Sequence, residues 1–219
     1  EGLDEKVKDS FGKALDVDIV LYLGLCNGAG WVTALGGHEK VLLGIEKILE
    51  LNWTSLMDVQ GLVYHELGHL YHSQHGIFHQ EPQEGPQRFV WQLFTEGVAM
   101  CFEQMLVGNW EFYQDDKEGW RAWCEENYTA ILRDFDKDLP TMSRENQRYF
   151  GDWVNYQDHG DTGYFLGAKW VQNLLGHHSF QEVIQFPLDS VCEFYKDHVK
   201  DVLGVESNLL QGITNDFNL

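Results

Sequence analysis

Basic residues are scarce in this sequence. The 219-residue chain has 15 lysines and arginines against 35 aspartates and glutamates, which gives a formal net charge of -20 at pH 7. A surface of that sign repels phosphate backbones and anionic lipid headgroups, so we expect neither a nucleic-acid partner nor a membrane partner. The acidity fits either general solubility or a preference for cationic substrates, and charge alone does not separate the two.

Cysteines and long apolar runs are also few. The four cysteines lie far apart without a C-x-x-C pair, which indicates reduced, mostly buried thiols rather than a disulfide scaffold. No apolar run approaches the roughly 18 residues that span a bilayer, so the sequence predicts a soluble protein. No signal sequence opens the chain, which favours the cytoplasm. A processed or secreted form stays open, because the first residue is Glu1 rather than Met.

The chain does contain enough apolar residues for one sizeable core. Hydrophobic residues make up 43% and aromatic residues 14% of it, which favours a folded globule over a disordered segment. The first 50 residues contain short runs rich in β-branched and aromatic residues, separated by the turn signals Asn27-Gly28 and Gly36-Gly37. These runs predict a small antiparallel sheet over residues 18–25, 31–35 and 41–45.

Helical periodicity dominates the rest of the chain. Apolar residues at positions 3, 7 and 11 predict a short opening helix, and Thr54 or Ser55 can cap a long helix that ends near residue 74. Further helices are expected over about 89–106, 117–137, 162–175 and 190–203. We therefore predict a single α+β domain over 1–219, with a sheet-rich part (1–50), a helical part (51–219) and an active-site cleft between them.

The strongest chemical signal is the segment His65-Glu66-Leu67-Gly68-His69. Residues i and i+4 share one face of a helix, so the imidazoles of His65 and His69 can bind one metal ion. Glu66 points to the side, where it cannot ligate but can reach a metal-bound water, as in metalloproteases. The flanking residues are uncharged, as a buried metal-bearing helix requires. The motif predicts one zinc ion per chain.

Zinc in a catalytic site needs a third protein ligand, with the fourth position left for water. His75 is one candidate, because it follows His65 by ten positions, as in the metzincin pattern H-E-x-x-H-x-x-G-x-x-H. His72 occupies the glycine position of that pattern, however, so the helix can continue and direct His75 elsewhere. In this alternative, Met142 would imitate the methionine turn of the metzincins.

Glu96 is the other candidate for the third ligand. It follows His69 by 27 residues, a gap that a loop and a returning antiparallel helix can fill. Apolar residues at positions 94, 98, 101, 102 and 105 form a stripe, so this helix should pack inward with its carboxylate near the metal. The explanation without a metal is a glutamate at a helix start, favoured there by the helix dipole.

These motifs resemble those of the gluzincins. H-E-L-G-H followed by T-E-G-V-A-M-C-F is similar to their zinc helix and glutamate helix, and G-Y-F-L-G at 163–167 is similar to the G-Y-x-x-G segment of a compact bacterial group of zinc proteases, the DUF2268-type proteins related to minigluzincins. The resemblance covers roughly residues 18–175 but rests on three short motifs. It implies a zincin-like fold, with a small sheet before the metal helix, and the ligands His65, His69 and Glu96.

One position departs from the family pattern. In thermolysin-like members, an aspartate four residues after the glutamate ligand supports a zinc-bound histidine. Met100 occupies that position here, so the partner of the histidine must differ. Glu103, on the same helix face, could substitute, since a ligating histidine normally needs such a partner.

The motifs predict hydrolysis of a peptide or protein substrate. Zinc would lower the pKa of its bound water and polarise the scissile carbonyl, while Glu66 would take the proton of the water and pass it to the leaving amine. The developing oxyanion needs a further donor, for which Tyr164 is the first candidate and His159 the second. An edge strand near 31–35 could pair with an extended peptide.

Two other functions stay open at this point. The domain could bind zinc without catalysis and serve in binding or regulation, although an idle peptidase need not keep Glu66. A structural zinc site usually has four protein ligands, often cysteines, and no cysteine lies at a suitable spacing. The sequence does not indicate the substrate, the choice between endopeptidase and exopeptidase, or the oligomeric state.

Overall fold

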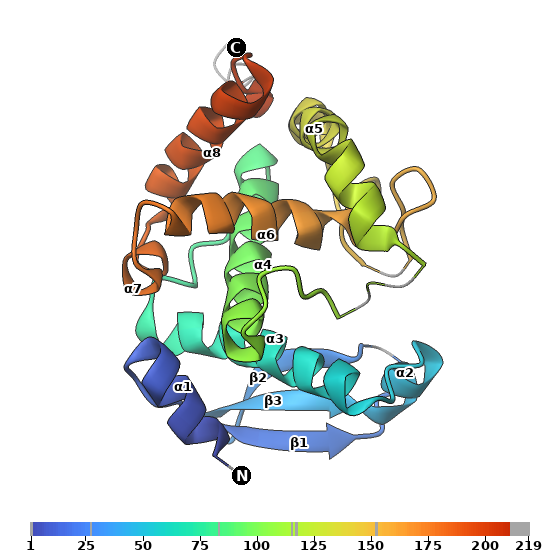
Figure 1. Cartoon of the computed structure of the whole chain (residues 1–219), viewed down its shortest axis with the longest axis vertical. Coiled ribbons are helices and arrows are strands. Elements are labelled where there is room, and N and C mark those ends of the chain that lie inside the picture. The colour runs from blue at the N-terminus through green and yellow to red at the C-terminus, as the bar shows by residue number, and fades with distance from the viewer. Residues whose placement is uncertain are drawn as a thin grey trace. The chain divides into compact units, whose positions relative to one another are not determined.

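The computed structural model of the chain (Figure 1) describes residues 2–26, 28–82, 84–114, 116, 118–151 and 153–210. The chain divides into two units, of which the first comprises Glu1–Gly76 with Val98–Asp116 and the second Ile77–Gly97 with Lys117–Leu219. Helix α4 (Pro86–Val107) supplies residues to both, because the boundary falls after Gly97. The single domain expected from the sequence stays a prediction. The fold is α+β, as predicted, with a sheet near the N-terminus followed by a mainly helical part.

The sheet of the first unit is mixed rather than wholly antiparallel. Strands β1 (Asp18–Tyr22), β2 (Gly30–Leu35) and β3 (His38–Gly44) lie in the order β1-β3-β2. β2 and β3 form an antiparallel hairpin, in which Gly36 and Gly37 turn the chain at φ values of 66° and 84°. β1 pairs parallel with β3, so the predicted antiparallel pairing is confirmed for β2 and β3 but was wrong for β1.

The connection between β1 and β2 explains this topology. After β1, the backbone N–H of Gly24 donates a hydrogen bond to the Glu46 carboxylate at 2.9 Å. The chain then passes the end of β3, where the N–H of Gly44 donates to the carbonyl of Ala29 at 2.9 Å. A Cβ atom on Gly44 would lie 2.2 Å from the carbonyl oxygen of Gly28. The glycine therefore leaves room for the chain to cross from one edge of the sheet to the other.

Helices α1 (Leu3–Phe11), α2 (Ile45–Glu50) and α3 (Leu56–His75) complete the first unit, together with the second half of α4. Helix α3 contacts β2 and β3, and it lies along the sheet in Figure 1. Ser55 caps α3 in a capping box: its hydroxyl accepts from the N–H of Asp58, and the Asp58 carboxylate accepts from the N–H of Ser55. The start of this helix is therefore fixed by local sequence.

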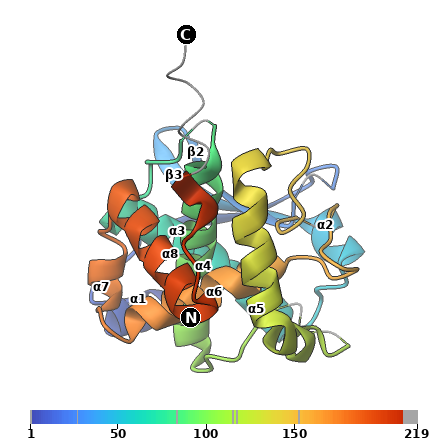
Figure 2. The ribbon, with the colours of Figure 1, turned by 90° about the horizontal axis from the view of Figure 1, so that it is seen from above.

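The second unit is helical. It contains the first half of α4 with α5 (Trp120–Asp138), α6 (Thr162–Leu175), α7 (Phe180–Val183) and α8 (Leu188–Leu203), besides the short turns η1 (Leu139–Thr141) and η2 (Asn208–Leu210). Helix α5 contacts α6 and α8, and α7 contacts α6. Figure 2 shows these helices from above. Fully buried aromatic side chains such as Trp91, Phe94, Phe165 and Trp170 fill the core of this unit.

Most of the predicted elements are present with small shifts at their ends. Helix α4 begins at Pro86 rather than near residue 89, because proline fits the first position of a helix. The short helices α2 and α7 were not predicted. The hairpin turn predicted at Asn27-Gly28 lies partly outside the described residues, since Asn27 is not among them.

The structure also bears on the predictions about the cysteines and about membrane-spanning segments. The four cysteines are free thiols, and three of them, Cys101, Cys124 and Cys192, are buried as expected. Across the described part of the chain, no helix combines the length and the apolar character that crossing a membrane requires.

His198 is a buried titratable group in the helices of the second unit. Its side chain lies on α8, and its Nε2 is 2.7 Å from the hydroxyl of Tyr128 on α5. Burial lowers the pKa of His198 from 6.5 to about 4, while the nearby Asp201 raises it. The folded protein therefore favours the neutral imidazole.

Protonation of His198 is expected to destabilise the protein as the pH falls. The pKa is lower in the folded state, so the contribution of this group to stability is full above about pH 6.5 and is lost toward pH 4. Between pH 7.5 and pH 5 this loss is about 2 kcal/mol. Urea unfolding of the wild type and of His198→Gln at both pH values measures it. The loss should be smaller in the variant, and equal losses would contradict the assignment.

Candidate metal centre

His65 and His69 lie one turn apart on α3, with their rings nearly perpendicular. Their Nε2 atoms are 3.2 Å apart, and their ring centroids are 4.8 Å apart. Two imidazole nitrogens that bind one tetrahedral zinc ion at about 2.0–2.1 Å are separated by about 3.3 Å. The two side chains therefore have the spacing of two ligands of one ion, as the i, i+4 pattern predicted.

Glu96 is the third member of this group. One ligand atom from each of His65, His69 and Glu96 lies within 4.8 Å of the other two. Glu96 lies near the middle of α4, so the preference of glutamate for a helix start does not explain it. Among the described residues, this is the one group of histidine, cysteine and acidic side chains that could hold a metal ion. Two histidines and a glutamate are a known donor set of catalytic zinc sites.

His75, the alternative third ligand, is engaged elsewhere. Its Nε2 lies 2.8 Å from the carbonyl oxygen of Ala14, and its ring packs edge-on against Tyr71. Helix α3 continues through the fully buried His72 to His75, as expected where the metzincin glycine is missing. The structure therefore favours Glu96 over His75 as the third member of the group.

Glu66 is buried against the first residue of β2. Its side chain is 6% exposed, and a Cβ atom added to Gly30 would lie 2.6 Å from Oε1 and 2.8 Å from Cγ of Glu66. Gly30 therefore provides the space that the Glu66 carboxylate occupies. The sequence pattern gave no indication of this contact, because it joins residues far apart in the chain. The role of Glu66 as general base stays a prediction.

Glu103 lies on α4 beside the first histidine. It is 1% exposed, and its Oε2 is 3.7 Å from the Nδ1 atom of His65. Burial raises the pKa of the Glu103 carboxyl, an effect that His65 opposes and Glu66 reinforces. Thus Glu103 contacts one of the two histidines, as predicted for a residue that substitutes for the aspartate missing at position 100.

Small residues set the distances between α4 and its neighbours. In the first unit, a Cβ atom on Gly68 of α3 would lie 2.8 Å from Cα of Ala99 and 3.1 Å from Cβ of Phe102. In the second unit, a Cβ atom on Gly97 would lie 2.3 Å from the carbonyl oxygen of Gly167 on α6. At both crossings the helix backbones approach to a distance that only glycine allows.

The G-Y-x-x-G segment forms the start of α6. Gly163 lies against the ring of Phe150, whose Cε1 would be 2.4 Å from an added Cβ, and Gly167 makes the crossing with α4. The ring of Tyr164 lies edge-on to that of Phe150, with centroids 5.7 Å apart. The two glycines therefore have a packing role, and the role of Tyr164 as an oxyanion donor stays a prediction.

His159 lies in the loop that precedes α6. Its ring stacks on Trp123 at a centroid distance of 3.6 Å, and its Nδ1 lies 2.9 Å from the carbonyl oxygen of Gln157. Gln157, Asp158 and Asp161 have φ values of 52°, 67° and 55°, a conformation that non-glycine residues seldom adopt. Strain of this kind gathers at functional sites, but the proposed role of His159 stays a prediction.

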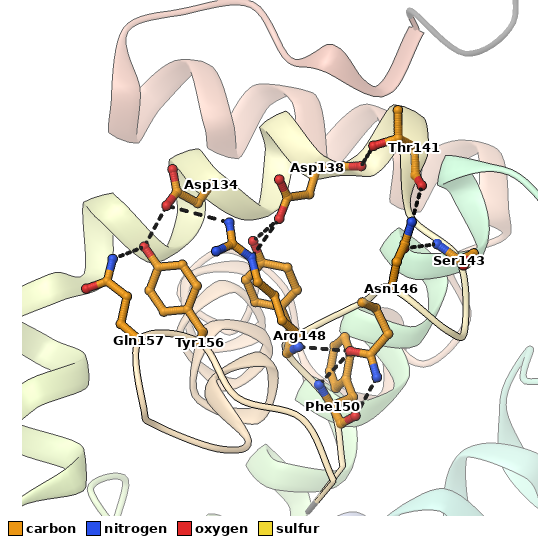
Figure 3. A network of polar contacts seen from close by, with 11 residues as sticks. Asp134, Asp138, Thr141, Ser143, Asn146, Arg148, Phe150, Tyr156 and Gln157 are labelled. Atoms are coloured by element: carbon orange, nitrogen blue, oxygen red, sulfur yellow. Dashed lines mark hydrogen bonds and ion pairs between the residues drawn. The ribbon is translucent and has the colours of Figure 1, made fainter.

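A polar network anchors the residues before this loop on α5 (Figure 3). Tyr149 and Arg148 donate hydrogen bonds to the Asp138 carboxylate at 2.7 and 3.0 Å. Tyr156 donates to Asp134 at 2.8 Å, and the Arg148 guanidinium lies 4.9 Å from the ring centroid of Tyr156. The spacing of the two aspartates by one helical turn was visible in the sequence, but their partners were not.

Comparison with protein-family models, with curated proteins and with solved structures gives no match for this chain. The structure itself establishes a His-His-Glu group with H-E-x-x-H spacing in an α+β fold. This group could hold one metal ion.

Gly97→Ala is expected to destabilise the protein. Alanine is the better helix former by about 1 kcal/mol, but its Cβ would lie 2.3 Å from a backbone oxygen that cannot rotate away. Overpacking of this kind costs about 1–3 kcal/mol, so we expect a net loss in urea unfolding.

Gly160→Ala is the matched control in the same unit. The nearest atom to its added Cβ is the Val154 carbonyl oxygen at 3.8 Å, an ordinary contact. Its stability should stay within about 0.5 kcal/mol of the wild type. A Gly97→Ala variant as stable as this control would show that the crossing at Gly167 is not tight.

Proposed function

We propose that this protein is a zinc-dependent peptidase of the gluzincin type. The observation that carries the proposal is the His65-His69-Glu96 group, whose ligand atoms lie within 4.8 Å of one another on the helix of the H-E-x-x-H motif and on α4. Glu66 supports it, because it lies beside the first histidine and is buried against Gly30. A site that only stores or senses zinc has no need of this carboxylate.

The three proposed ligands would hold zinc, which supplies Lewis-acid chemistry for hydrolysis when bound. Glu66 accepts a proton from the attacking water and returns it to the leaving amide nitrogen. Its burial at 6% exposure keeps bulk water from competing for that proton. Tyr164 and His159 remain the candidates for hydrogen-bond donors to the developing oxyanion.

The position of β2 supports a peptide as the substrate. β2 lies at one edge of the sheet, where β3 is its one neighbour among the described strands. It begins at Gly30, which contacts Glu66. An extended peptide that adds to this edge would have its backbone guided toward the proposed general base.

The purified protein is expected to contain about one zinc ion per chain, because a His2Glu donor set leaves one open position on one ion. Elemental analysis of the wild type, Glu96→Ala and His75→Ala measures it. We expect Glu96→Ala to lose zinc and His75→Ala, whose side chain contacts Ala14, to keep it. Wild-type protein that stays free of zinc after metal addition would refute the proposed site.

Glu66→Gln is expected to keep zinc and lose peptidase activity. Removal of a general base lowers turnover by about 10²–10⁴-fold. Gly30→Ala, which forces the Glu66 carboxylate to move, should lower turnover by a smaller factor at unchanged zinc content. Cleavage of a quenched fluorescent peptide library by zinc-loaded protein gives the measurement. Zinc-loaded wild type that cleaves no library member would favour the alternative of an idle zinc-binding domain.

A further inference from the structure

The two ring nitrogens of His65 face different groups. Its Nε2 faces the Nε2 of His69 at 3.2 Å, whereas its Nδ1 faces Oε2 of Glu103 at 3.7 Å. An imidazole that binds a metal through one nitrogen carries a proton on the other, and that proton normally points to an acceptor. In His65, Nε2 is therefore placed to bind a metal ion, and Nδ1 is placed to carry the proton.

Glu103 reaches this position because α3 has a glycine at residue 61. A Cβ atom on Gly61 would lie 2.7 Å from Oε1 of Glu103 and 3.1 Å from Cε1 of Phe112. Gly61 precedes His65 by one helical turn, so both contacts of the carboxylate fall on the same face of α3. The carboxylate thus lies against α3 between Gly61 and His65, in a space that a side chain at residue 61 would fill.

The folded chain gains little stability from a carboxylate in this place. Glu103 is 1% exposed, and no hydrogen-bond partner of its Oε1 is present among the described residues. The distance of 3.7 Å from Oε2 to Nδ1 of His65 is about 0.5 Å beyond the upper limit of a normal hydrogen bond, so the contact is mainly electrostatic. A buried carboxylate with so few partners is a net cost to folding, and an apolar residue of similar volume would often be neutral or stabilising.

We propose that Glu103 is a positioning residue of the metal centre, which holds the proton of His65 on Nδ1 and so presents the Nε2 lone pair to the metal. This inference rests on the proposed zinc site. Glu103 acts through His65 and does not touch the metal. The same tautomer lets His65 Nε2 accept a hydrogen bond from His69 across their 3.2 Å separation when no metal is bound.

Glu103→Leu separates positioning from a structural role. The variant should unfold at the same temperature as the wild type or higher, and should bind zinc about 10–100-fold more weakly in chelator competition. Gly61→Ala, which displaces the carboxylate and leaves it intact, should weaken zinc binding in the same direction.

Asp136→Asn is the matched control. Asp136 is 2% exposed and accepts hydrogen bonds from Ser207 and Asn208 in the second unit. Its amide variant should lose stability and keep the zinc affinity of the wild type. A Glu103→Leu variant that binds zinc as tightly as the wild type would overturn the proposal, whether or not it also loses stability as Asp136→Asn does.

A measurement on metal-free protein tests the same point without zinc. Neutral imidazole in water carries its proton mainly on Nε2, so nitrogen NMR of ¹⁵N-histidine-labelled wild type should show His65 protonated on Nδ1 instead, with the signal assigned by its loss in His65→Asn. Glu103→Leu should return the proton to Nε2. A wild-type Nε2–H tautomer would overturn the proposal. Failure of zinc binding together with an Nδ1–H tautomer would refute the proposed function and leave the Glu103 contact established.

Discussion

The candidate site depends on how closely other helices approach α4. Gly68 lets α3 meet α4 at Ala99 in the first unit, and Gly97 lets α6 meet α4 in the second. Glu96 directly precedes Gly97 and lies within one turn of Ala99, so both contacts fix the segment that bears it. Metal ligands must lie within about 0.5 Å of a productive geometry. A methyl group at either glycine would overlap backbone atoms and force a helix to move. Backbone packing therefore fixes the helix segment that carries the carboxylate.

The first unit also buries polar groups that a purely structural core would avoid. Glu66, His72 and Glu103 are 6%, 0% and 1% exposed. Desolvation of a carboxylate is unfavourable unless partners compensate for it, and the histidine at 3.7 Å from Glu103 compensates for it only in part. Sequences break the rules of core composition mainly where function requires it. The position of these groups on α3 and α4, which bear the candidate ligands, therefore adds to the evidence of the ligand distances.

The sequence predicted the features that depend on interactions between residues close together in the chain. The capping box at Ser55 and the spacing of His65 and His69 depend on residues within one or two helical turns, so both were predictable. The strand order β1-β3-β2 depends on the close approach of Gly44 to Gly28, 16 residues earlier in the chain. Such a contact leaves no periodic pattern in the sequence. The contacts of Gly30 with Glu66 and of Gly61 with Glu103 were hidden for the same reason. Glu96 was predictable because an inward-facing carboxylate on an apolar helix needs a partner.

Three glycines in the motif segments have packing roles that do not depend on a metal ion. Gly68 in H-E-L-G-H, Gly97 in T-E-G-V-A and Gly167 in G-Y-F-L-G all lie at close backbone crossings. Any chain that brings three helices this close needs small residues at such positions, whatever its chemistry. A likeness in these glycines is thus evidence for backbone geometry. The evidence for chemistry comes from the donor atoms that this geometry brings together, two imidazole nitrogens 3.2 Å apart and the carboxylate of Glu96.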